Sequence, residues 1–161
     1  MAAAITARHG NALRPRSAGR EAPSAPAERA APAEPPGPNS LTISGIPKNV
    51  ARARAFVAEV LGPDHPCADV AVLLCSELVT NAVLHSDSRR PGGTVTIAVA
   101  DLTDSVEVKV IDEGSPSSIP VVKADTLAAD GHGLFLVENL AERWGYESDD
   151  AGTAVWFLLT P

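Results

Sequence analysis

The strongest constraint on the fold of this chain is a pair of short segments, Thr94–Ala100 and Ser105–Asp112, in which apolar and polar residues alternate. Alternation with a period of two puts every second side chain on the same face of a strand. The apolar face comprises Val95, Ile97 and Val99 in the first segment and Val106, Val108 and Val110 in the second. Asp101–Asp104 between them is typical of a turn, so the pattern predicts an antiparallel hairpin with one apolar face that another layer must cover.

Helical patterns on both sides of the hairpin can supply that layer. Pro47 stands where a first helical residue is expected, Lys48–Leu61 has one apolar side, and Gly62-Pro63 ends the pattern. A second helix is predicted from about Asp64 or Cys67 to His85; its apolar residues nearly encircle it, so we expect it to be packed on most sides. A third helix is predicted after Gly133.

Three further strands complete the expected sheet. One is short, at Leu41–Ser44, and two others, near Trp144–Ser148 and Thr153–Leu159, flank an Asp-Asp-Ala-Gly turn, whereas residues 113–130 have the composition of a loop. The sequence therefore predicts an α+β fold, a two-layer sandwich of a mostly antiparallel sheet with three helices on one face.

Charge and proline divide the chain into two parts. Residues 1–40 carry five Arg and three Glu, a charge of +2, with seven of the 14 prolines, whereas residues 41–161 carry -9. The first part has almost no large apolar side chains to bury, so we expect residues 1–39 to be a disordered leader and residues 40–161 to form one domain.

The acidic domain limits the classes of partner. Binding to duplex nucleic acid requires clustered Lys and Arg, so we expect no direct nucleic-acid partner. No run approaches 18 consecutive apolar residues and the N-terminus has no apolar signal core, so we expect neither a membrane span nor secretion and favour a cytoplasmic protein.

Four polar or glycine-rich pieces stand out against the apolar patterns. Glu77, Asn81 and His85 are spaced four residues apart, which puts them on one face of the second helix. Asp112 is the last residue of a predicted strand and lies on the same face as the apolar residues of that strand. Gly114 follows two residues later. The other two pieces are Gly131-His132-Gly133-Leu134 at the start of the third helix and Gly152-Thr153 at the start of the last strand.

Each piece alone has an ordinary structural explanation. The helical trio fits a face open to solvent, Asp-x-Gly and the glycine loop fit common turns, and a single Gly-Thr means little. A functional interpretation is also open for each. A strand-terminal carboxylate can accept a hydrogen bond from an exocyclic amine, and backbone N–H groups at a glycine-rich helix start can bind an anion. The glycine loop is neither a Walker A motif nor a Rossmann fingerprint.

Taken together and in this order, the four pieces resemble the GHKL (Bergerat-fold) ATPases. Two motifs are similar to those of the stand-alone bacterial anti-sigma-factor serine kinases. They are Glu77-Leu-Val-Thr-Asn81-Ala-Val-Leu-His85, and Gly133-Leu-Phe-Leu-Val followed by Arg143-Trp-Gly145. The resemblance covers roughly residues 40–160. It implies ATP and Mg²⁺ as cofactors, a sigma factor or a STAS-type anti-anti-sigma protein as partner, and a possible homodimer.

The resemblance also implies roles for matching residues. Asn81 would ligate Mg²⁺, and Glu77 would orient or deprotonate the attacking hydroxyl. Asp112, supported by Thr153, would bind the adenine amine. Gly114, Gly131 and Gly133 would permit close backbone contact with the nucleotide, and the neighbouring His132 and Leu134 would belong to the same binding site. An amide oxygen suits Mg²⁺, and a carboxylate beside a γ-phosphate is a plausible base, so the chemistry of these residues agrees.

His132 departs from the pattern, since many relatives have Arg between these two glycines. Histidine is shorter and often neutral at pH 7, so the departure weakens the case for efficient phosphoryl transfer. The sequence therefore leaves two functions open, an anti-sigma-factor serine/threonine kinase and a nucleotide-binding regulatory module with little or no kinase activity. The ATPase part of a histidine kinase is less favoured, because no helical segment with a phospho-acceptor histidine precedes residue 41, and a gyrase- or chaperone-type ATPase is less favoured still.

Overall fold

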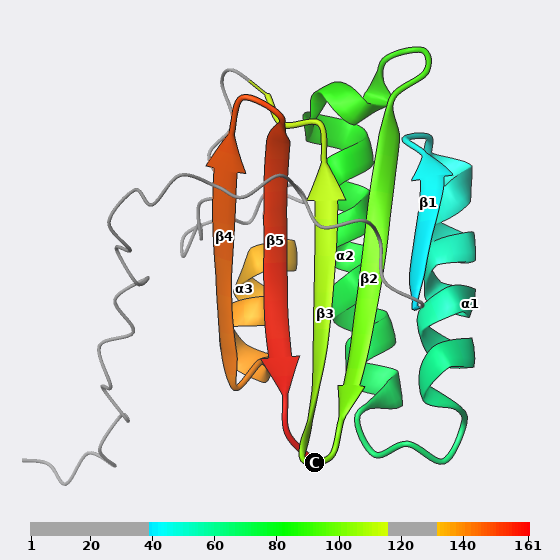
Figure 1. The fold of residues 1–161 in the computed structure, drawn as a ribbon, viewed down its shortest axis with the longest axis vertical. Coiled ribbons are helices and arrows are strands. Elements are labelled where there is room, and N and C mark those ends of the chain that lie inside the picture. Colours follow the sequence, from blue (N-terminus) through cyan, green and yellow to red (C-terminus); the bar gives the residue numbers. More distant parts are fainter. Residues whose placement is uncertain (1–38, 116–131) are drawn as a thin grey trace, which may run out of the picture.

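One antiparallel sheet carries three α-helices on a single face (Figure 1). The structure, a computed structural model, describes residues 39–115 and 132–161, and for His132 only the backbone. All but the last residue of the predicted leader, and most of the predicted 113–130 loop, lie outside these residues. The elements in chain order are β1 (Ser40–Ser44), η1 (Pro47–Asn49), α1 (Val50–Leu61), α2 (Ala68–His85), η2 (Asp87–Arg89), β2 (Thr94–Leu102), β3 (Ser105–Asp112), α3 (His132–Leu140), β4 (Arg143–Asp149) and β5 (Gly152–Leu159).

The sheet has the order β1-β2-β3-β5-β4, and every pair of neighbours is antiparallel. The last strand, β5, enters between β3 and β4, and this placement sets Thr153 directly opposite Asp112. The β2–β3 ladder closes on the pair Leu102 and Ser105, so the turn spans only two residues. The predicted four-residue turn at Asp101–Asp104 was therefore too long, because the strand pairing extends past the alternating apolar residues.

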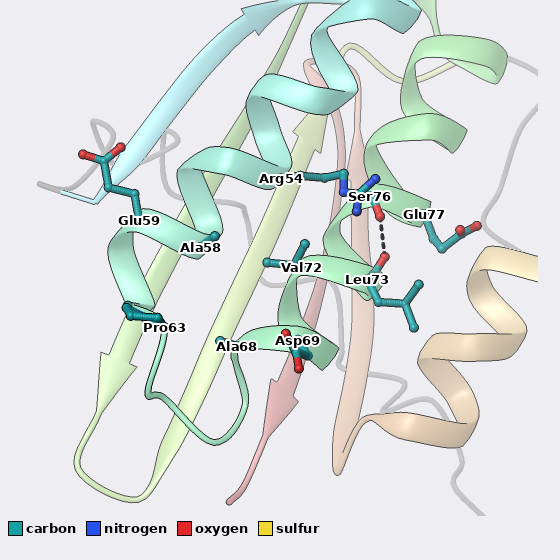
Figure 2. Close-up of a pocket in the computed structure, with 11 residues that line it drawn as sticks. Arg54, Ala58, Glu59, Pro63, Ala68, Asp69, Val72, Leu73, Ser76 and Glu77 are labelled. Atoms are coloured by element: carbon teal, nitrogen blue, oxygen red, sulfur yellow. Dashed lines mark hydrogen bonds between the residues drawn. The ribbon is translucent and has the colours of Figure 1, made fainter.

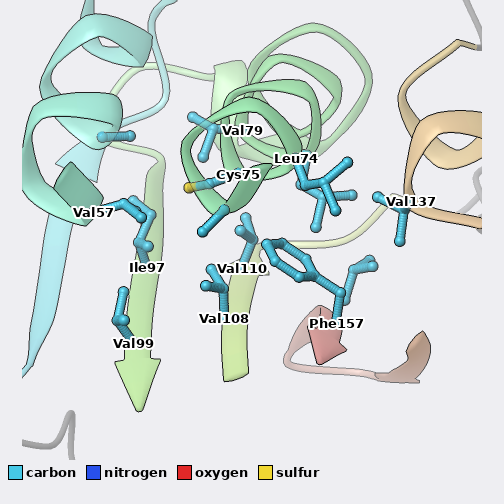
Figure 3. Packing of buried hydrophobic residues seen from close by; sticks show 14 of the residues in the cluster. Val57, Leu74, Cys75, Val79, Ile97, Val99, Val108, Val110, Val137 and Phe157 are labelled. Carbon is cyan, nitrogen blue, oxygen red and sulfur yellow. The ribbon is translucent and has the colours of Figure 1, made fainter. Parts of the chain in front are cut away.

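The core lies between the sheet and the helices (Figure 3). The alternating apolar residues of β2 and β3 all point into it, as predicted, and are at most 5% exposed. Phe157 of β5 packs there with Leu74 of α2 and Val137 of α3, and all three are fully buried. The prediction of a two-layer α+β sandwich is confirmed.

Two helix starts differ from the prediction. Pro47 begins a 3₁₀ turn in which Asn49 N–H donates to the Ile46 carbonyl, and the α-helix begins only at Val50. The third helix begins at His132, before the glycine that was expected to precede it. The predicted end of the first helix is confirmed, since Gly62 follows Leu61 with a φ of 78°, which glycine adopts without strain.

α2 is the central helix and carries the predicted polar trio. It has 18 residues and is long and apolar enough to cross a membrane by length and composition, a test that the core helix of a soluble protein also passes. Eight of its residues are buried against the rest of the domain. Leu73 and Leu84 are 40% and 43% exposed, so one stripe of this helix stays open, which is compatible with the expected packing on most sides.

Candidate functional site

The structure brings two of the predicted pieces together where α3 begins beside α2. Glu77 and Asn81 lie one helical turn apart, and Gly133 is buried against both. A Cβ atom added to Gly133 would lie 2.8 Å from Asn81 Nδ2 and 3.2 Å from Glu77 Cβ. Glycine therefore allows α3 to approach these two side chains without displacing Asn81. We call Glu77, Asn81 and Gly133 the helix cluster.

The remaining members of these two pieces are less closely involved. His85 continues the stripe to the end of α2 but is exposed, and it lies two turns from Glu77. Leu134 is buried at 9% exposure and belongs to the core. Gly131 and the side chain of His132 lie outside the described residues, so their predicted roles stay predictions.

The other two predicted pieces meet at the ends of β3 and β5. Asp112 is paired with Thr153 in the strand register, and its Oδ1 accepts a hydrogen bond from the Gly114 N–H at 2.6 Å. Gly114 has a φ of 68°, and a Cβ there would lie 3.3 Å from the Cα of Gly152. Thr153 is only 4% exposed and, like Val155, Phe157 and Leu159, lies on the buried face of β5, as its parity predicted. We call Asp112, Gly114 and Thr153 the strand cluster.

Sequence reasoning missed the segment that joins the two clusters. Two residues after α2 are bonded to the end of β3: Asp87 N–H donates to the Gly114 carbonyl at 2.6 Å, and Glu113 N–H donates to Ser88 Oγ at 2.9 Å. The Ser86 hydroxyl, which donates to the Ala82 carbonyl at 2.8 Å, also lowers the pKa of Asp112. Ser88 is fully buried. The serines gave little signal in the sequence, because hydroxyls beyond a helix end usually serve as caps.

Ser148 was also missed. It lies opposite Thr153 in the β4–β5 register, and the two hydroxyl oxygens are 3.0 Å apart. A correct pairing of the last two strands would have identified this neighbour, because residues directly opposite each other interact.

Opposing effects act on the charge of Asp112. Burial raises the pKa of its carboxyl group, and the hydrogen bonds from Gly114 N–H and the Ser86 hydroxyl lower it. The nearby charge of Glu113 contributes a further increase in the pKa of Asp112. The carboxylate is thus partly withdrawn from water but supplied with donors, which suits a group that accepts one more hydrogen bond from a ligand.

The site also suits a Mg²⁺ ion that is held mainly by the phosphates of a bound nucleotide and by water. Among residues 39–115 and 132–161, no three His, Cys, Asp or Glu side chains gather into a metal site. The amide nitrogen of Asn81 faces Gly133, and the amide group also carries an oxygen that can ligate a metal ion. Mg²⁺ is commonly bound by one or two protein groups together with phosphates and waters. Asn81 is therefore the described residue suited to hold Mg²⁺ against a phosphate.

An open groove of about 740 Å³ reaches Glu77 from the other side of α2 (Figure 2). It lies between α1 and α2, and Glu77 at its end points from α2 toward α3. The groove is lined by Arg54, Ala58, Glu59, Gly62, Pro63, Ala68, Asp69, Val72, Leu73, Ser76 and Glu77. Glu77 is therefore shared between the groove and the helix cluster.

Comparisons with known proteins show the family of this domain. Residues 43–159 match the model of the histidine kinase-like ATPase domain. A serine-protein kinase, RsbW of Oceanobacillus iheyensis, is 27% identical over an alignment of 116 residues. The match covers 63% of this chain and 73% of that protein.

A solved structure, the RsbU and RsbW domains of Rv1364c from Mycobacterium tuberculosis, shares the fold with a TM-score of 0.51 at 24% identity. That match covers 75% of this chain but only 32% of the other, so this chain spans about a third of that protein's length. The family match includes both clusters and every described strand except the first residues of β1. The chain belongs to the histidine kinase-like ATPase domain family.

Proposed function

We propose that this protein binds Mg·ATP and transfers the γ-phosphoryl group to a serine or threonine of a STAS-type anti-anti-sigma protein, and that it acts as an antagonist of a sigma factor. The ATP-binding part follows from the family, and the kinase part is supported by similarity to a relative described as a serine-protein kinase. The observation that carries the proposal is the close packing of Gly133 against Glu77 and Asn81.

The two clusters suit the two ends of a nucleotide. Glu77 and Ser86 are nine residues apart on and just beyond α2, which corresponds to about 13 Å along the helix axis. This span fits an extended ligand with a base at one end and phosphates at the other. Asp112 would accept a hydrogen bond from the exocyclic amine of adenine, with Thr153 beside it, and the start of α3 would face the phosphates.

Glu77 is the described carboxylate best placed for the transfer step. Phosphoryl transfer depends mainly on positioning and on stabilisation of charge, and Mg²⁺, when bound, would offset the charge of the phosphates. Asn81 would hold that ion. Glu77 would accept the proton of the attacking serine or threonine hydroxyl, or orient that hydroxyl toward the phosphate.

The groove between α1 and α2 gives such a hydroxyl a route to Glu77. It is open to solvent and ends at the same carboxylate that packs against Gly133. A segment of a partner protein lying in it would bring its hydroxyl to Glu77 from the side opposite α3. A folded protein, rather than a small molecule, is the acceptor that an open groove of this kind favours.

The test is transfer of radiolabelled phosphate from ATP to a protein partner captured from the native cell. We expect Glu77→Gln to lower transfer by about 10² to 10⁴-fold, the range for loss of a general base, and to leave ATP affinity within about twofold of the wild type. Glu147→Gln, an exposed carboxylate on β4, is the matched control and should transfer at the wild-type rate.

The outcomes separate the two functions left open by the sequence. A labelled STAS protein that loses its label with Glu77→Gln supports the kinase. ATP binding without any transfer by the wild type would favour a regulatory module, and equal rates for Glu77→Gln and wild type would remove Glu77 as the base.

A further inference from the structure

We propose that Ser88 is a positioning residue for the base end of the nucleotide site, and that its hydroxyl group holds the 112–114 segment so that the Asp112 carboxylate is directed at the exocyclic amine of the ligand. The inference rests on the proposed binding of an adenine nucleotide. Ser88 lies in η2, the short turn that follows α2, and it is fully buried. A buried hydroxyl group needs hydrogen-bond partners, and those partners show what it holds in place.

The hydroxyl group of Ser88 bridges the ends of two strands. Its Oγ donates to the Thr94 carbonyl oxygen at 2.6 Å and accepts the backbone N–H of Glu113 at 2.9 Å. Val95 and Asp112 form the last pair of the β2–β3 ladder at this end, so the bridge stands one residue beyond that pair. Because a hydroxyl group can donate one hydrogen bond and accept others, both bonds form at the same time.

The backbone of Ser88 is itself held in place. Its N–H donates to Ser86 Oγ at 3.1 Å. Gly45 and Gly93 pack so closely against it that a Cβ atom on either glycine would overlap the Ser88 carbonyl oxygen. Ser88 is therefore a fixed point against which the end of β3 is positioned.

The position of this segment sets the direction of the Asp112 side chain. Gly114 N–H donates to Asp112 Oδ1 at 2.6 Å, and the Gly114 carbonyl accepts the N–H of Asp87 at 2.6 Å. Glu113, whose own N–H is bound by Ser88, lies between Asp112 and Gly114 in the chain. The bond to Ser88 therefore holds the residue that connects the carboxylate to the N–H group that orients it.

Loss of the Ser88 hydroxyl group would release this arrangement. The Thr94 carbonyl and the Glu113 N–H would both lose a partner, and unpaired backbone groups that are partly buried favour a shift toward new partners. A carboxylate accepts hydrogen bonds only, so a well-directed Asp112 favours the amine of adenine over the carbonyl that guanine carries at the same position. A shifted segment weakens this preference.

The experiment is calorimetric titration of ATP and of GTP into the full chain in the presence of Mg²⁺. We expect Ser88→Ala to lower the ratio of ATP affinity to GTP affinity by about three- to tenfold, the range for one weakened hydrogen bond. A smaller folded fraction would weaken both nucleotides by the same factor. An equal loss for ATP and GTP, or a wild type that binds the two equally well, would overturn the inference.

A double-mutant cycle tests whether Ser88 acts through Asp112. In the Asp112→Asn background, Ser88→Ala should leave the affinity ratio within about twofold of its value in Asp112→Asn alone, because the carboxylate that Ser88 positions is already gone. The same fall in both backgrounds would overturn the inference. If Ser88→Ala does not fold, Ser88→Cys, which keeps a weaker donor and acceptor, should give an intermediate ratio.

Thr80→Ala is the matched control. The Thr80 hydroxyl also donates to a backbone carbonyl, that of Ser76 at 2.7 Å, but takes no part in either cluster. We expect this variant to keep the wild-type ratio of ATP to GTP affinity. A fall equal to that of Ser88→Ala would show that loss of any hydroxyl group on this part of the chain is sufficient, and would overturn the inference.

A readout without nucleotide separates this inference from the proposed function. The NMR signal of the Gly114 amide proton, which is bound to Asp112 Oδ1, should shift upfield and exchange faster with solvent in Ser88→Ala than in wild type. If wild type binds no ATP but this signal changes, the proposed function fails while the role of Ser88 in holding Asp112 stands. An unchanged Gly114 signal would overturn the inference whether or not ATP binds.

Discussion

Replacement of Gly133 by alanine tests the geometry of the helix cluster most specifically. The added Cβ would lie 2.8 Å from Asn81 Nδ2 and 3.4 Å from Glu77 Oε2, whereas ordinary contacts begin at about 3.4 Å. One of the facing groups must therefore move by about 0.6 Å, the difference between 3.4 and 2.8. The group with freedom to move is the Asn81 side chain, because Gly133 is held in α3.

We expect this displacement to affect function much more than folding. A misplacement of about 1 Å in a site costs about 10²-fold in rate, so Gly133→Ala should lower phosphoryl transfer, or ATP affinity in the presence of Mg²⁺, by about ten- to a hundredfold. Alanine is favoured over glycine within a helix by about 0.5–1 kcal/mol, which offsets the local crowding. The free energy of unfolding should stay within about 1 kcal/mol of the wild-type value.

The assays are ATP titration with and without Mg²⁺ and urea unfolding of the same preparations. Asn139→Ala, an exposed substitution on the same helix, is the control and should leave ATP binding unchanged. Wild-type affinity and transfer in Gly133→Ala would refute the argument, because the cluster would then be loose enough to accept a side chain.

Three further predictions concern charge and packing. Asp112→Asn should abolish the preference for adenine nucleotides. It should also raise the free energy of unfolding at pH 7 by up to about 1 kcal/mol, because it removes a partly buried charge from a carboxyl group whose pKa is raised. This gain in stability should shrink as the pH falls through the pKa of Asp112, and a gain that grows on acidification would contradict the prediction. Leu74→Ala should lower the free energy of unfolding by about 2–5 kcal/mol in urea melts, because Leu74 is fully buried. Gly145→Ala should cost about 1–3 kcal/mol in the same assay, since its Cβ would lie 2.8 Å from the Trp156 ring; no loss would mean that the ring moves freely.

Much of the fold was predictable because its signals are local. Strict alternation in β2 and β3 determined both the strand type and the buried face, and parity alone placed Asp112 and Thr153 on the helical side. Gly62 ended the first helix as expected, because a positive φ is easily reached by glycine. What parity could not give was the insertion of β5 between β3 and β4, which depends on long-range pairing.

The candidate site was predictable for a different reason. Glu77 and Asn81 are joined by helical spacing, but their contact with Gly133 follows only from the packing of α3 on α2. The serines that support Asp112 and Thr153 carried no distinctive spacing, so they were missed. The start of α1 was misplaced because Pro47 is equally compatible with a 3₁₀ turn and an α-helix.

Binding of Mg·ATP beside Asn81 can be measured by calorimetric titration of ATP into the full chain with and without Mg²⁺, for wild type and Asn81→Ala. We expect saturable one-to-one binding by the wild type that Mg²⁺ strengthens, and binding by Asn81→Ala that Mg²⁺ hardly affects. Absence of ATP binding by the folded wild type, or an equal Mg²⁺ effect in both proteins, would contradict it.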